Sequence, residues 1–187
     1  MAEKKAEAPL AEQQICVTCG FCCDGTLFAY ARLSPGEKGQ LPEKIDLNSF
    51  TRDNKDYFRH PCPYFSERCT IYNMKKPDVC STYRCQLLKD FAAEKLSLPE
   101  VMNIINEARR MRSTIMEQYR NISGKEEEIS FWHLLTDLGN IQRSLSDDES
   151  LSIGYEILTA GSNIFEALLI KHIRSASDFE NMMTGKG

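Results

Sequence analysis

The sequence lacks three features that would place the protein at a membrane, on nucleic acid or outside the cell. No apolar run approaches the length that crosses a bilayer. Residues 1–14 contain no apolar core of a signal peptide. There is no basic surplus either, because 23 Lys and Arg residues stand against 27 Asp and Glu residues, giving a net charge of −4. We therefore expect a cytoplasmic protein that binds neither membranes nor nucleic acid.

The sequence also lacks the short motifs of the common catalytic and nucleotide-binding folds. It has no phosphate-binding glycine loop, no G-x-G-x-x-G and no G-x-S-x-G nucleophile elbow. Histidine is scarce, with three in 187 residues, and none forms a metal motif with another. We expect no catalytic residue and no organic cofactor. These absences argue against an enzyme without deciding the question.

Cysteine is absent from the last 102 residues, whereas the first 85 residues contain eight. The same part of the chain holds six of the seven prolines and only short apolar runs. This composition is typical of a loop-rich module whose core is too small to fold by burial alone. In a chain without an export signal, it predicts metal ligation or redox chemistry in preference to disulfides.

The pattern becomes helical near residue 86. Apolar residues recur at helical spacing from Val101 to Ile122, from Ile129 to Leu145 and from Leu151 to Leu168. Ser97 and Pro99 predict the start of the first long helix. The predicted fold class is a small metal-stabilised α+β module with little regular structure, followed by a helical bundle. The expected divisions are a disordered tail at 1–13, the cysteine module at 14–88, the helical bundle at 89–176 and a flexible tail at 177–187.

Shorter elements are also expected. Residues 26–33 and 44–50 read as two extended segments, the first ended by Ser-Pro-Gly. A short helix over 86–96 joins the two halves. Capping-box patterns at 123–126 and 146–149 predict the starts of the second and third long helices.

The stretch "CVTCGFCC" carries four cysteines in eight residues. Cys16-x-x-Cys19 followed by glycine has the spacing of a zinc knuckle, and with Cys22 it forms the C-x-x-C-x-x-C run of iron–sulfur proteins. A disulfide between Cys22 and Cys23 would require a strained ring. Because adjacent side chains in an extended segment point apart, these two cysteines are expected to serve different metals or different roles.

The remaining cysteines are separated by six, ten and four residues and include no C-x-x-C pair, which weakens the reading as a zinc ribbon. They are Cys62, Cys69, Cys80 and Cys85. Cys62 precedes a proline, as does the remote cluster ligand of bacterial ferredoxins. The C-x-x-C-x-x-C run and the missing second knuckle favour iron slightly over zinc.

The order of these motifs is similar to that of a known family. The run from Cys16 to Cys23 is followed by Cys62-Pro-Tyr-Phe, Cys69-Thr-Ile-Tyr, Lys76-Pro-Asp-Val-Cys80 and Tyr83-Arg-Cys85. This order resembles the C-x-x-C-x-x-C-C (YkgJ-type) cysteine-cluster family, which is regarded as zinc- or iron-chelating. The resemblance covers about residues 14–88 and does not explain the helices. Ser81 and Lys76 depart from it, since arginine is common at both positions.

The expected function is metal binding by a scaffold, metal-handling or accessory protein. The alternatives are an iron–sulfur enzyme or enzyme subunit for electron transfer or protein modification, and a thiol redox sensor. The metal is zinc in two four-thiolate sites, or iron, with a [4Fe–4S] cluster on four cysteines and the others structural or at a second site. A protein partner could meet the C-terminal helices. The predicted metal ligands are Cys16, Cys19, Cys22, Cys23, Cys62, Cys69, Cys80 and Cys85.

Other polar residues receive plainer interpretations. His60 before proline is expected to be an extended surface residue, with metal ligation as the alternative. His133 is expected at a helix surface, and His172 near a helix C-terminus, where a cation is favourable. The segment Arg109–Arg112 is expected to be a solvated helix face and not a nucleic-acid patch.

Overall fold

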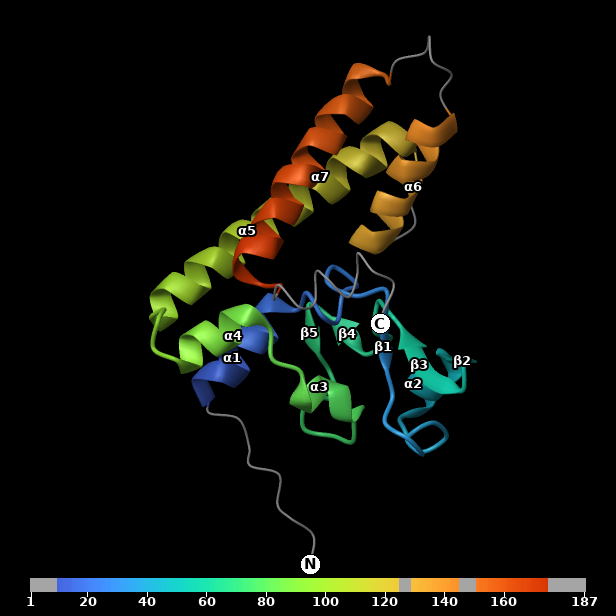
Figure 1. Cartoon of the computed structure of the whole chain (residues 1–187), viewed down its shortest axis with the longest axis vertical. Coiled ribbons are helices and arrows are strands. Elements are labelled where there is room, and N and C mark those ends of the chain that lie inside the picture. Colours follow the sequence, from blue (N-terminus) through green and yellow to red (C-terminus); the bar gives the residue numbers. More distant parts are fainter. Residues whose placement is uncertain (1–9, 125–128, 145–150, 175–187) are drawn as a thin grey trace, which may run out of the picture.

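The computed structural model describes residues 10–124, 129–144 and 151–174. Figure 1 shows the long helices α5 (Leu98–Ser123) and α7 (Ile153–His172) side by side in one half of the molecule. Helix α6 (Phe131–Ser144) lies in the same half, whereas the strands and short helices lie in the other. The predicted fold class, a loop-rich part followed by a helical region, is confirmed.

Two small antiparallel sheets form in the first half of the chain. The larger contains β1 (Tyr30–Arg32), β2 (Ser49–Arg52) and β3 (Lys55–Arg59) in the order β1-β3-β2. The turn between β2 and β3 places Asp53 and Asn54 at φ of 50° and 56°, as a two-residue hairpin requires. The second sheet pairs β4 (Phe65–Ser66) with β5 (Arg68–Cys69).

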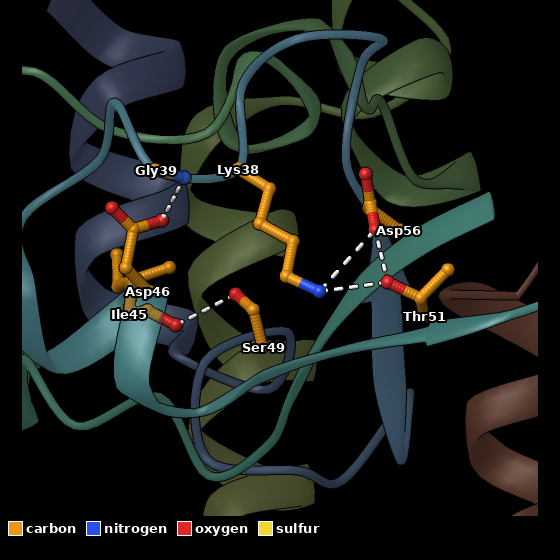
Figure 2. Close-up of polar contacts among 7 residues, drawn as sticks. All are labelled: Lys38, Gly39, Ile45, Asp46, Ser49, Thr51 and Asp56. Atoms are coloured by element: carbon orange, nitrogen blue, oxygen red, sulfur yellow. Dashed lines mark hydrogen bonds and ion pairs between the residues drawn. The ribbon is translucent and has the colours of Figure 1, made fainter.

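The extended segment expected at 26–33 is confirmed in part by β1, but the one expected at 44–50 is wrong in its first half. Residues Glu43–Leu47 form helix α2 before β2 begins. The Asp46 carboxylate accepts hydrogen bonds from the backbone N–H groups of Gly39, at 2.9 Å, and Leu41, at 3.1 Å. Ser49 Oγ donates to the Ile45 carbonyl at 2.7 Å, as Figure 2 shows. These bonds hold a helical turn where apolar alternation suggested a strand.

Figure 2 also shows a polar contact that joins the loop before α2 to the hairpin. Lys38 Nζ donates to Thr51 Oγ1 at 2.7 Å and lies 3.5 Å from Asp56 Oδ1. Thr51 Oγ1 in turn donates to Asp56 Oδ1 at 2.6 Å. The group is exposed, so it fixes the position of the loop more than it adds stability.

The long helix expected after Ser97 begins there. The Glu100 side chain accepts the Ser97 N–H at 2.7 Å, and α5 ends at Gly124, whose φ of 67° is left-handed. The capping patterns at 123–126 and 146–149 fall wholly or partly outside the described residues. The remaining helices are α1 (Leu10–Cys19), α3 (Asp78–Thr82) and α4 (Gln86–Ala92).

Helix α1 corrects the expected extent of the N-terminal tail, because residues 10–13 are helical. Glu12 is buried and forms an ion pair with Arg84, with 2.6 Å between Oε1 and Nη2. Ile15, one turn later, is almost fully buried. These contacts with distant residues order the segment, and its own sequence gave no sign of them. The expected tails at 1–9 and 177–187 lie outside the described residues.

The described residues contain two hydrophobic cores. The smaller core lies under the sheet and consists of Leu33, Leu41, Ile45, Phe58 and Ile71. The larger core is formed mainly by the helices. Phe21 and Leu27 also belong to it, and they come from residues 20–29 between α1 and β1, which we call the cysteine loop. The Phe21 ring meets the Phe165 ring edge-on at a centroid distance of 6.1 Å. The first half of the chain therefore packs into the core of the second.

The sequence was expected to contain no apolar run long enough to cross a membrane, but helix α7 is such a run. By length and composition it meets that test, with a mean hydropathy of 1.2 over an 18-residue window, of which 22% is buried. Its buried face carries Leu158, Phe165 and Leu169, and it packs along α5. Its exposed side carries Ile153, Ile157 and Ile164.

Candidate metal centre

A tight turn at the end of α1 presents the first four cysteines. Cys16 and Cys19 lie one turn apart on the helix, and Gly20 ends it with a φ of 71°. The Gly20 carbonyl accepts hydrogen bonds from the N–H groups of Cys23, at 2.8 Å, and Asp24, at 3.0 Å. A Cβ at Gly20 would lie 2.7 Å from Phe65 Cζ. Only glycine satisfies both the backbone conformation and this close approach.

The other four cysteines come from separate elements that converge on this turn. The Cys62 N–H donates to the Cys23 carbonyl at 2.7 Å, which ties the two segments together. Cys69 lies in β5 opposite Phe65, and Cys80 lies within α3. Cys85 is the N-cap residue of α4. All eight cysteines are free thiols.

All eight cysteines line one cavity of about 290 Å³ between the two hydrophobic cores. The rest of its lining is mainly apolar and includes Phe21, Leu27 and Phe58. Soft thiolate sulfur is the ligand type that zinc and iron–sulfur clusters use. The donor set and the mainly apolar surroundings therefore fit either metal.

Within the described residues, no three Cys, His, Asp or Glu side chains already stand in the arrangement of a metal site. The sulfur atoms surround the cavity without closing into a coordination sphere. Metal ligation therefore requires the thiols to turn toward one another.

Four thiols on the side of the larger core interact with one another. Burial raises the pKa of Cys16 to about 11, and the Cys85 thiol and the Glu12 carboxylate add to the rise. Burial also raises the pKa of Cys22 well above its ordinary value, followed in size by repulsion from Cys19 and Cys85. We call this the helix-side group, which consists of Cys16, Cys19, Cys22 and Cys85.

The other four thiols interact in the same way on the side of the smaller core. Burial raises the pKa of Cys80 to about 12, with further rises from the Cys62 and Cys69 thiols. Burial is also the main cause that raises the pKa of Cys23, followed by the same three thiols of this side. We call this the sheet-side group, which consists of Cys23, Cys62, Cys69 and Cys80.

The raised pKa values describe what these thiols do without metal. At neutral pH the thiols whose pKa is raised are protonated, whereas a reactive nucleophilic cysteine needs a lowered pKa. They are Cys16, Cys19, Cys22, Cys23, Cys62, Cys80 and Cys85. Ligation to a metal replaces those protons, and the metal charge then compensates the buried thiolates. The electrostatics therefore argue against a reactive nucleophilic thiol among these residues.

His60 does not lie on the surface as expected. It lines the cavity, and its buried Nδ1 has no hydrogen-bond partner among the described residues. Burial lowers the pKa of His60 to about 4, while a hydrogen bond with the backbone of Cys23 opposes that shift. The imidazole is neutral at pH 7, so its Nδ1 and Nε2 differ in donor and acceptor character.

Arginines of α5 contact the end of α1 and the cysteine loop, which corrects in part the expectation that 109–112 is a solvated helix face, since Arg109 and Arg110 are exposed. Arg112 Nε lies 2.8 Å from Thr26 Oγ1 and 3.1 Å from Asp24 Oδ2. Arg109 donates to the Thr18 carbonyl. Arg110, between them, does face solvent, where it pairs with a glutamate of its own helix. The spacing of Arg109 and Arg112 by three residues was the available signal, because it places both on one helix face.

Eight thiols around one cavity define a cysteine-cluster module, and comparison with known families agrees. The model of the CxxCxxCC family, described as a putative zinc- or iron-chelating domain, matches residues 15–118. The chain belongs to this family. The match extends through most of α5 and includes the arginines that hold the loop. Neither the curated proteins nor the solved structures include a match to the chain.

Proposed function

We propose that this protein binds zinc or iron through its eight cysteines and acts as a metal-handling or accessory protein in the cytoplasm. The observation that carries the proposal is the convergence of all eight thiols on one cavity, although they come from five separate parts of the chain. Ligated, they cross-link short elements that bury little apolar surface of their own.

The chain's own residues supply what a thiolate site needs. The lining of the cavity is mainly apolar, although Cys16 and Cys80 are exposed to solvent. The positive charges of Arg84 and Lys76 oppose the rise in the pKa of Cys16 and so favour its thiolate. Lys76 does the same for Cys80. These cations offset part of the negative charge that four thiolates retain around a divalent ion.

Within this proposal we favour iron, because the C-x-x-C-x-x-C run is the arrangement that holds three corners of a cluster. An iron–sulfur cluster would supply one-electron redox chemistry, whereas zinc would supply a structural cross-link. Each group of four thiols has the ligand number that either requires.

Metal content and a visible absorption spectrum test the proposal, on the full chain purified without oxygen. Iron with acid-labile sulfide and broad visible absorption that bleaches on reduction supports the iron form. A colourless chain with stoichiometric zinc supports the zinc form. The variant Cys62→Ser should bind less metal than the wild type. Ser81→Ala, a matched change outside the thiols, should bind as much as the wild type. A wild-type chain that retains no metal and restores none on incubation with Zn²⁺ or Fe²⁺ and sulfide would overturn the proposal.

A further inference from the structure

We propose that the eight cysteines form two separate metal sites, one made by the helix-side group and the other by the sheet-side group. The inference rests on the proposed function, since it assigns ligands to the metal that function requires. It divides the cysteines across the pair Cys22 and Cys23, which are neighbours in the chain.

The helix-side group belongs to the larger core. Cys19, Cys22 and Cys85 all pack against that core, and Cys16 precedes Cys19 by one helical turn. The ion pair between Glu12 of α1 and Arg84 fixes α1 beside the residue that precedes Cys85. This group therefore joins the end of α1 to the start of α4.

The start of α4 is itself anchored to the helical half. The Gln86 N–H donates to the Ile173 carbonyl at 2.9 Å, so the residue after Cys85 is bonded to the end of α7. A metal held by the helix-side group would thus cross-link α1 to α4, whose start is hydrogen-bonded to the end of α7.

The sheet-side group belongs to the smaller core. Cys62 and Cys69 pack against it, and so does Val79, the residue before Cys80. The hydrogen bond from the Cys62 N–H to the Cys23 carbonyl brings Cys23 to this side. A metal held here would cross-link the cysteine loop, the two-stranded sheet and α3.

The loop that carries α3 is also tied to the smaller core by Glu37. Its carboxylate accepts the Asp78 N–H at 2.7 Å and the Ser34 N–H at 2.6 Å. Because Asp78 begins α3, this bridge places Cys80 next to the segment that supplies Leu33 to the smaller core. No comparable bridge is needed for Cys69, which is already paired within its sheet.

Backbone hydrogen bonds and membership of the two cores therefore agree on one partition.

Three variants, each lacking two cysteines, test the partition. One pair lies within the helix-side group (Cys19→Ser with Cys85→Ser), one within the sheet-side group (Cys62→Ser with Cys80→Ser). The matched control takes one from each group (Cys19→Ser with Cys80→Ser). With the full chain loaded with Zn²⁺, we expect two tightly bound zinc ions in the wild type, one in each within-group variant and none in the control.

The outcomes separate this inference from the proposed function. A wild-type chain without stoichiometric zinc or iron overturns the proposed function. A wild-type chain with a single metal site, or a control variant that keeps one tightly bound zinc ion, overturns the partition alone. A different grouping of the cysteines in the cadmium measurement described next would also overturn the partition. That measurement uses the wild-type chain, so it does not depend on how the variants fold.

That measurement uses the wild-type chain loaded with ¹¹³Cd²⁺ and correlates each cadmium nucleus with the cysteine Hβ protons that couple to it. The partition predicts two cadmium signals. One should correlate with the helix-side cysteines and the other with the sheet-side cysteines. A cadmium signal that correlates with both Cys16 and Cys62 would refute it.

Discussion

The variant Arg112→Gln should destabilise the protein, because it leaves a buried carboxylate without its cation. Arg112 contacts Asp24 at 3.1 Å, directly after the cysteine run. The side chains of Asp24 and Arg112 are only 13% and 23% exposed. Breaking a fully buried ion pair costs about 3–5 kcal/mol, and partial exposure reduces this to about 2 kcal/mol. For a chain of this size, that lowers Tm by about 4–8 °C.

The effect should depend on pH in a defined direction. Burial raises the pKa of Asp24, while Arg112 lowers it, so the variant raises it further. The folded variant then binds more protons than its unfolded form, and its stability falls as pH rises through the pKa of the folded state. The deficit relative to the wild type should therefore be smaller at about pH 5.5 than at about pH 7.

Thermal melts of the metal-loaded chain measure both effects. The matched control is Arg110→Gln, which removes a solvent-facing ion pair with Glu107 and should leave Tm nearly unchanged. Adding Asp24→Asn to Arg112→Gln should restore part of the lost stability, because no buried charge remains. Equal Tm values for the two single variants would refute the assigned role of Arg112.

Gly20→Ala should lower Tm more than Gly39→Ala. Both glycines have positive φ, 71° and 82°. At Gly20 the new Cβ would lie 2.7 Å from the Phe65 ring, whereas nothing lies within 4 Å of a Cβ at Gly39. Equal Tm values for the two variants would contradict the clash. Glu37→Gln should speed amide hydrogen exchange at the two N–H groups that its carboxylate accepts, at 2.6 Å and 2.7 Å, while unchanged protection would show that the bridge is not needed. The metal-free chain should lose stability above about pH 8.5, because burial raises the pKa of Cys80 to about 12 and the folded state then holds more protons than the unfolded one. Urea melts in chelator across this pH range measure the loss, and a flat profile would speak against buried thiols.

The parts of the fold that depend on local sequence could be predicted. The start of α5 at Ser97 is set by a cap and a first-turn proline, and both lie in the sequence itself. Helical periodicity likewise located α5 and most of α6 and α7. Helix α2 could not be found in this way, since hydrogen bonds from outside the helix to Asp46 stabilise it.

The sequence proposed the eight cysteines as ligands, which stays a prediction, and it could not show how they are arranged around the cavity that they line. The cysteine count and spacing indicate metal ligands, because few other uses explain eight thiols in one short segment. Which thiols lie together depends on contacts between distant residues, such as the bond from Cys62 to Cys23. The contact between Arg112 and Asp24 joins residues 88 positions apart, and a pattern within one helix cannot reveal its partner.

The edge-on contact between Phe21 and Phe165 has a consequence for the order in which the protein is made. Phe165 follows Cys85 by 80 residues, which a ribosome adds in about 4–16 s at about 5–20 residues per second. The smaller core is complete by Ile71, before that interval begins. While the rest of the chain is translated, the sheet side of the module already has its full set of core residues. During that interval the Phe21 ring lacks its edge-on partner Phe165.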